Sequence, residues 1–224
     1  MDPTKKTLQP YVTGSSVLAI KYNEGIIVAA DTLGSYGSLA RFTDLQRMSK
    51  VTNHTLIGGS GDISDLQQIQ KTVESLILEN TGFKKDEEPL TPKEIQQYIS
   101  RVMYNRRSRF DPLWNHIIVA GYQNNESFLG AVDIFGTFYE DNTIASGFGA
   151  YFAQPLLRKG YKEDLTKDEA IDLIKTCLKV LFYRDARTIN KFQIAEVSEG
   201  GITISDPFEL ETHWEIADWQ EGHL

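Results

Sequence analysis

The stretch from Thr13 to Arg47 decides the fold of the N-terminal part, and it reads TGSSVLAIKYNEGIIVAADTLGSYGSLARFTDLQR. Two apolar runs, 17–20 and 26–30, flank the turn residues Asn23-Glu24-Gly25. Runs rich in β-branched residues with a glycine-containing turn between them are typical of a β-hairpin. The sequence therefore predicts two adjacent antiparallel strands near the start of the chain.

Three polar residues stand before, at the end of and after this hairpin. Ser15 stands before the first strand, Asp31 closes the second strand, and Arg47 follows sixteen residues later. A hydroxyl can act as a nucleophile when a base and electrostatic support lie beside it. We therefore treat Ser15 and Asp31 as candidate site residues.

Bulk composition excludes several classes of function. The chain has 224 residues, of which 41% are hydrophobic and 24% are charged, and this is ordinary for a globular protein. Its length fits one large domain or two small ones. The formal net charge of −8 argues against a non-specific polyanion binder. A single cysteine, Cys177, rules out an intramolecular disulfide framework and a multi-cysteine zinc site, and we expect it to be a buried apolar side chain.

The sequence offers no sign of targeting to a membrane and no sign of a metal or cofactor. The polar segment 1–14 has no apolar signal-peptide core, and no apolar run reaches the length of a membrane helix. Phosphate loops, Gly-x-Ser-x-Gly elbows and His-Glu-x-x-His motifs do not occur. We expect no cofactor and no metal, because the four histidines stand far apart in the sequence: His54, His116, His213 and His223.

Further hairpins and helices are expected along the rest of the chain. Apolar alternation and turn residues predict strands at 39–42, 48–51, 55–57, 114–122, 127–133, 137–139, 143–145, 192–197 and 202–204. The glycines at 58–61 are expected to end a strand before a helix begins at Ile63. Capping boxes begin further helices after Thr91 and after Thr166. A helical stretch at 150–158 should bend at Pro155.

These elements indicate an α+β fold of layered sheets and helices, because paired helices alternate with hairpins. Two other features stand out. The basic cluster Arg106-Arg107-Ser108-Arg109 suits a helix C-terminus or a contact with another subunit. The C-terminal segment 206–224 contains Phe208, Trp214 and Trp219 among acidic residues, which is too aromatic for an inert linker.

From about Thr13 to Asp206 the sequence resembles the β-type subunits of the proteasome, which are N-terminal-nucleophile hydrolases. The stretches that carry the resemblance are GSYGSLARF at 34–42, SGFGAYFAQPLLRK at 146–159 and YRDAR at 183–187. Within the family, the first of these resembles members at the seventh position of the β ring. The resemblance implies a four-layer αββα sandwich at 15–205, preceded by a leader-like extension at 1–14 and followed by a tail at 206–224 that contacts other subunits.

The resemblance also implies where a catalytic site would lie. In active members an N-terminal threonine is the nucleophile and its own amino group is the base, supported by a lysine, an aspartate, a serine and an Asp/Ser pair. Ser15 takes the place of the nucleophile and follows Gly14, the residue at the expected self-cleavage point. Asp31 matches the aspartate, and Asp185 with Thr188 matches the Asp/Ser pair.

Two positions depart from the active pattern. Arg47 replaces the lysine, and a guanidinium is larger than an ammonium, planar and permanently charged. Phe148 stands where the serine is expected and removes a hydroxyl. The resemblance therefore implies a vestigial site at Ser15, Asp31, Arg47, Phe148, Asp185 and Thr188, in which Asp31 pairs with Arg47 for structural reasons.

Three functions follow as alternatives. The first is a non-catalytic structural β subunit of the 20S proteasome core, located in cytoplasm and nucleus. Its partners would be α-ring subunits, neighbouring β subunits and β subunits of the opposite ring reached by the tail. The second is an active peptidase that uses Ser15. The third is a free-standing amidase or binding module of related fold. The first is our prediction.

Overall fold

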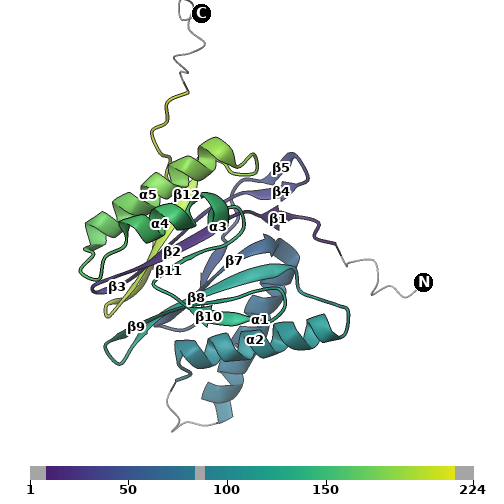
Figure 1. The fold of residues 1–224 in the computed structure, drawn as a ribbon. Coiled ribbons are helices and arrows are strands. Elements are labelled where there is room, and N and C mark those ends of the chain that lie inside the picture. Colours follow the sequence, from purple (N-terminus) through teal and green to yellow (C-terminus); the bar gives the residue numbers. More distant parts are fainter. Residues whose placement is uncertain (1–8, 84–88, 215–224) are drawn as a thin grey trace, which may run out of the picture.

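Two stacked antiparallel sheets form the centre of the structure, and helices cover their outer faces (Figure 1). The computed structural model describes residues 9–83 and 89–214. Within these residues no helix is long and apolar enough to cross a membrane.

The first sheet has eight strands in the order β10-β9-β8-β7-β1-β4-β5, and β6 pairs with β7. Its strands are β1 (Thr13–Gly14), β4 (Gly34–Tyr36), β5 (Leu39–Phe42), β6 (Met48–Lys50), β7 (Thr55–Asp62), β8 (Asn115–Gln123), β9 (Glu126–Val132) and β10 (Phe138–Glu140). The turn between β8 and β9 places Asn124 and Asn125 at positive φ, as a tight two-residue hairpin requires.

The second sheet has five strands in the order β11-β2-β3-β12-β13. Its strands are β2 (Val17–Tyr22), β3 (Gly25–Asp31), β11 (Thr143–Ala145), β12 (Phe192–Ser198) and β13 (Gly201–Ile204). The expected N-terminal hairpin is present as β2 and β3, which pair from Val17 opposite Ala30 to Tyr22 opposite Gly25. Asp31 therefore ends a central strand, next to the start of β2.

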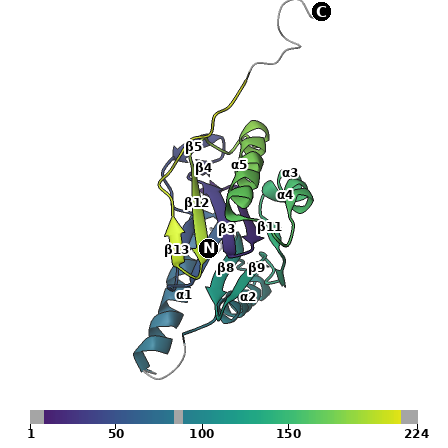
Figure 2. The same ribbon diagram turned by 90° about the vertical axis from the view of Figure 1, so that its left-hand side faces the viewer.

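Helices complete the four layers. The helices α1 (Ile63–Phe83) and α2 (Pro92–Ser108) lie on the first sheet, whereas α5 (Lys167–Arg184) lies on the second (Figure 2). The short helices α3 (Gly149–Phe152) and α4 (Gln154–Gly160) pack beside α5 and β11. The predicted α+β sandwich is confirmed.

Three apolar clusters hold the layers together, one at each interface. Between the sheets the buried side chains include Val17, Val28, Leu56, Ile118 and Leu129. A second cluster joins α1 and α2 to the first sheet, and a third joins α4 and α5 to the second sheet. Because each sheet is buried on both faces, its central strands read as continuous apolar runs. This explains why β3 is buried at every position.

The helix boundaries match the sequence signals closely. The capping boxes at Thr91 and Thr166 are both formed, each with a glutamate three residues later. Pro155 lies just after Ala153, where the predicted helical stretch divides into α3 and α4. A proline lacks the N–H that a continuous helix needs, so the break is expected there.

The prediction that the glycines at 58–61 end a strand was wrong. β7 continues through them to Asp62, and α1 begins immediately afterwards. A Cβ on Gly59 would lie 2.3 Å from the Leu66 side chain, and one on Gly58 would lie 3.1 Å from that of Val17. Glycine is needed here because the helix and the opposite sheet pack close against the strand, a use of glycine inside strands that the local pattern does not reveal.

The described part of the tail packs on the domain. Phe208 forms an isolated β-bridge with Phe192. Trp214 contacts Phe182 and Tyr183 of α5 edge-on, at ring-centroid distances of 5.5 and 4.9 Å. Trp219, the third aromatic residue of the tail that we expect to contact other subunits, lies outside the described residues.

The capping box of α5 gives a stability prediction. Thr166→Ala removes the hydroxyl that accepts from the Glu169 N–H, so the free energy of unfolding should fall by about 1 kcal/mol. Thr176→Ala is the matched control, because Thr176 lies inside the same helix and alanine is the better helix former there. Urea denaturation of the purified chain measures both. Equal losses in the two variants would contradict the capping role.

Candidate functional site

The candidate residues meet where β2, β3 and the C-terminal end of α5 come together. Ser15 lies between β1 and β2, and Asp31 is the last residue of β3. Arg47 directly precedes β6, and Asp185 is the C-cap of α5. Four segments far apart in the sequence thus bring their polar side chains to one end of the two sheets.

Arg47 is the centre of this arrangement. Only 1% of it is exposed, and its guanidinium forms an ion pair with Asp31. The same guanidinium donates to three backbone carbonyls: Nε to Asp31 at 3.0 Å, Nη1 to Ser15 at 2.8 Å and Nη2 to Ser16 at 2.9 Å. A buried charge is tolerated when it is paired and its hydrogens have acceptors. The expected ion pair of Asp31 with Arg47 is present.

Asp31 is held from two sides. Besides Arg47 it accepts a hydrogen bond from the Ile189 N–H at 3.3 Å. Burial raises the pKa of the Asp31 carboxyl above its ordinary value, and the attraction of Arg47 partly opposes this rise. Asp31 is thus a carboxyl whose charge depends on Arg47.

Asp185 organises the other half of the site. Its carboxylate accepts from the Thr188 hydroxyl at 3.0 Å and from the Arg187 N–H at 2.9 Å. The Ser15 hydroxyl also donates to Asp185. Ser15, Asp185 and Thr188, which are separate in sequence, therefore form one hydrogen-bonded group.

Phe148 lies apart from this network. It is 51% exposed and lies directly before α3, with its ring 6.3 Å from that of Phe152. Phe148 and Ser15 line one cavity of about 580 Å³, together with Tyr139, Tyr151 and Arg187. Five of the six predicted positions are thus linked by hydrogen bonds, and the sixth, Phe148, lines the cavity beside Ser15 with its aromatic ring.

Sequence reasoning missed the serines that fix the neighbouring turn. The Ser146 hydroxyl accepts from the Val17 N–H at 3.1 Å, and the Ser16 hydroxyl accepts from the Gly149 N–H at 2.8 Å. Both bonds join the start of β2 to the turn before α3. The signal that could have indicated Ser146 is its place in the Ser-Gly-Phe-Gly motif, two residues before Phe148.

The residues before Ser15 belong to the sheet. Thr13 pairs with Ser35 of β4 on one side and with Asp62 of β7 on the other, and Gly14 pairs with Gly61. A Cβ on Gly14 would lie 2.5 Å from Cδ of Arg47, so only glycine fits there. The peptide bond between Gly14 and Ser15 therefore continues directly from an inner strand.

The chemical capacity of this arrangement is limited. The Ser15 hydroxyl donates to Asp185, which could accept its proton. In the uncut chain, however, the Ser15 nitrogen forms the peptide bond to Gly14 and cannot act as a base. The charged group nearest its carbonyl is a guanidinium, which does not release a proton at physiological pH. Among the described residues, no group of three potential ligands could hold a metal ion.

Comparison with known proteins agrees with this geometry. The family model "Proteasome subunit" matches residues 11–197, which is most of the chain. The chain belongs to the proteasome subunit family. This membership accounts for the αββα sandwich.

Individual proteasome subunits are similar over nearly their whole length. Proteasome subunit beta type-4 of Xenopus laevis is 49% identical over 222 residues, covering 98% of this chain and 91% of that protein. The subunit of the same name from Arabidopsis thaliana is 44% identical, covering 97% and 88%. Proteasome subunit beta type-7 of Saccharomyces cerevisiae is 43% identical, covering 99% and 87%. The similarity is therefore to β-type subunits in particular.

Removing the central guanidinium gives a prediction for stability. Arg47→Met leaves Asp31 buried without its counter-ion and three carbonyls without their donors, so the free energy of unfolding should fall by about 3–5 kcal/mol. Arg158→Met is the control, because its ion pair with Asp141 is exposed and should contribute less than about 1 kcal/mol. Denaturant unfolding of both variants measures the difference.

The same variant should depend on pH in a definite direction. Without Arg47 the pKa of folded Asp31 rises further above the unfolded value of about 3.9. When the pKa of an acid is higher in the folded than in the unfolded state, the protein loses stability as the pH rises above the unfolded pKa. The loss of unfolding free energy caused by Arg47→Met should therefore be larger at pH 7 than at pH 5. A deficit that is the same at both values would contradict the ion-pair assignment.

Proposed function

We propose that this chain is a non-catalytic structural β subunit of the 20S proteasome core particle. In this role it fills one position in each β ring and contributes contacts rather than chemistry to ubiquitin-dependent protein degradation. The observation that carries the proposal is the Arg47 network, which fixes a permanently charged guanidinium against the carbonyls of Ser15 and Ser16.

The electrostatics of the site support the absence of peptidase activity. An amine tuned to exchange protons at neutral pH is replaced by a guanidinium, which stays protonated and here binds one carboxylate and three backbone carbonyls. The loop hydroxyls near the site, those of Ser16 and Ser146, are used to bind backbone N–H groups. No proton relay to Ser15 follows from these contacts.

The position of β1 supports the same conclusion. A free amino terminus at Ser15 would require cleavage after Gly14, and that cleavage would detach a strand that pairs with both β4 and β7. The uncut chain keeps these pairings and leaves Ser15 without the amino group that the family uses as its base. These pairings support retention of the leader.

One observation favours the alternative of an active peptidase that uses Ser15. The Ser15 hydroxyl donates to Asp185 and faces a cavity, an arrangement that a serine nucleophile would also need. This alternative requires a base, and Asp185 is already occupied by Thr188 and the Arg187 N–H. Active peptidase chemistry at Ser15 is therefore the alternative function, and intact mass and inhibitor labelling distinguish it from the structural role.

Partners and location follow from the proposed role. The subunit would contact the α ring, its neighbours in the β ring and, through the tail that packs on α5, β subunits of the opposite ring. Its location would be that of the assembled particle, in cytoplasm and nucleus.

Intact mass of the chain recovered from its native assembly tests the proposal. We expect a mass that includes residues before Ser15, no labelling by a covalent proteasome inhibitor, and unchanged peptidase activities of the particle when Ser15→Ala is introduced. A chain that begins at Ser15 and carries the inhibitor would overturn the non-catalytic role. Recovery of the chain only as a free monomer would overturn the assembly role.

A further inference from the structure

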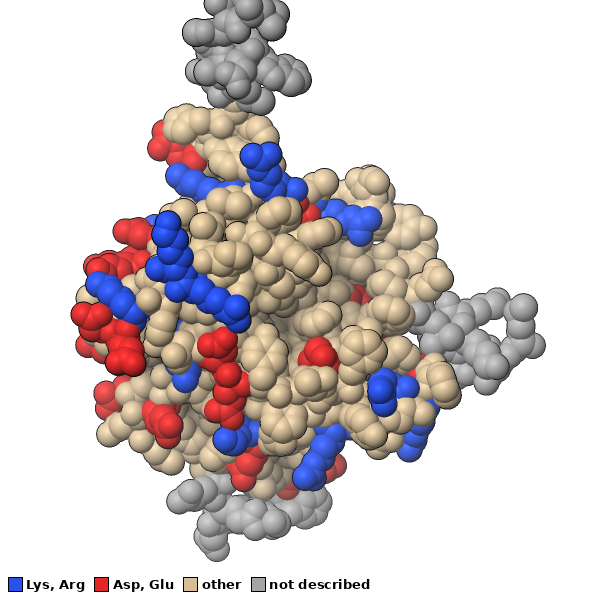
Figure 3. Space-filling view, in the orientation of Figure 1, with Lys and Arg blue, Asp and Glu red and all other residues tan. Residues whose placement is uncertain are grey.

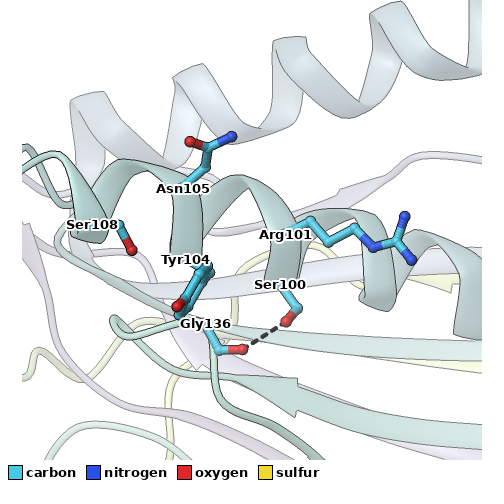
Figure 4. Close-up of a pocket in the computed structure, with 6 residues that line it drawn as sticks. All are labelled: Ser100, Arg101, Tyr104, Asn105, Ser108 and Gly136. Atoms are coloured by element: carbon cyan, nitrogen blue, oxygen red, sulfur yellow. Dashed lines mark hydrogen bonds between the residues drawn. The ribbon is translucent and has the colours of Figure 1, made fainter.

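A second cavity lies on the outer helical layer and shares no lining residue with the cavity at Ser15. It measures about 530 Å³ and is lined by Ser100, Arg101, Tyr104, Asn105, Ser108 and Gly136 (Figure 4). Five of these residues lie on α2, and Gly136 belongs to the turn between β9 and β10. We call this feature the α2 groove.

The floor of the α2 groove is rigid. The Ser100 hydroxyl donates to the Gly136 carbonyl at 2.6 Å, and Asp133 accepts from two N–H groups of the same turn, those of Phe135 and Thr137, each at 2.8 Å. Gly136 has φ +83°, and a Cβ there would lie 2.8 Å from Tyr104. The turn is thus locked against α2, and the groove is preformed.

Its rim is positively charged. Arg101 lines the groove, and Arg107 lies beside the lining residue Tyr104. Neither forms an ion pair with a carboxylate that the structure describes, whereas Arg106 is paired with Asp111 at 3.0 Å. The Arg107 guanidinium lies 5.4 Å from the centre of the Tyr104 ring. In the space-filling view, several positive side chains lie at the lower right over the C-terminal part of α2, where few acidic side chains are seen, and others lie at the top and on the left among the acidic ones (Figure 3).

The helix dipole explains only part of this charge. Arg106 and Arg107 are in the last turn of α2, where cations are favoured. Arg101 lies seven residues before the helix ends at Ser108, beyond the reach of that effect. Unpaired arginines at the rim of a preformed groove, in a chain of net charge −8, are instead complementary to a negatively charged partner.

We propose that the α2 groove docks an acidic segment of a neighbouring proteasome subunit, an inference that rests on the proposed function. A carboxylate of that segment binds the Arg101 guanidinium, and an apolar side chain next to it packs on Tyr104. Phe110 and Phe135, which are 89% and 57% exposed, lie within two residues in sequence of the lining residues Ser108 and Gly136, and exposed aromatic rings suit a protein partner. A nucleic acid would be repelled by the overall negative charge of the chain.

Photo-crosslinking in the assembled particle tests where the groove docks. A photoreactive amino acid at Asn105, inside the groove, should crosslink to a segment of another subunit that contains aspartate or glutamate, as identified by mass spectrometry. Crosslinking to a segment without acidic residues, to nucleic acid or to no partner at all would overturn the proposal.

Charge reversal tests which interaction drives the docking. Arg101→Glu should reduce incorporation of the chain into the particle by about tenfold. Lys71→Glu is the matched control, because Lys71 is an exposed cation inside the neighbouring helix α1 and lies outside the groove, and it should change incorporation by less than about twofold. Equal effects of the two variants would contradict the proposal.

Two further readouts separate folding from docking. Arg101→Gln keeps the helix and removes the charge, so it should show an intermediate loss, and replacing the crosslinked acid by arginine should restore incorporation of Arg101→Glu. Failure of this rescue would overturn the assignment. If the unmodified chain is never found in a particle, the proposed function fails; if it is found there but Asn105 yields no acidic crosslink, only the present inference fails.

Discussion

The buried ion pair of Arg47 with Asp31 is the interaction on which this end of the molecule depends. One guanidinium neutralises the carboxyl at the end of β3 and also binds the carbonyls of Ser15 and Ser16 at the start of β2. Strand ends expose carbonyls that need donors, and here a single side chain supplies them. The close approach of Arg47 also requires glycine at position 14, so the charge fixes the path of β1 as well.

The contacts of Arg47 show how one side chain holds the polar residues of this site in place. A lysine in this place would present one compact ammonium and could not reach three carbonyls and a carboxylate in a planar fork. The guanidinium does so, and it remains charged at every physiological pH. The features that make Arg47 a good structural centre therefore make it a poor partner for proton transfer.

Local signals in the sequence predicted the fold well, and packing accounts for what they missed. The capping boxes at Thr91 and Thr166 and the β2–β3 hairpin depend on neighbours within a few residues, so the pattern reveals them. The continuation of β7 through Gly59 depends on Leu66 of a helix packed above it, which no local window contains. Phe148, Asp185 and Thr188 became candidates only through resemblance to a family. The roles of Ser16 and Ser146 depend on contacts between residues more than a hundred positions apart, which no local pattern contains.

The two aspartates show why carboxylates at such a site are no sign of catalysis by themselves. Asp185 caps the end of α5 and accepts from the Arg187 N–H, so it orders the turn that leads into β12. Asp31 accepts from the Ile189 N–H in that same turn and joins it to β3. Each carboxylate would be needed to hold the second sheet to its helix even if Ser15 never reacted. The presence of these carboxylates therefore does not distinguish a catalytic site from a structural one, because both aspartates have structural hydrogen bonds of their own.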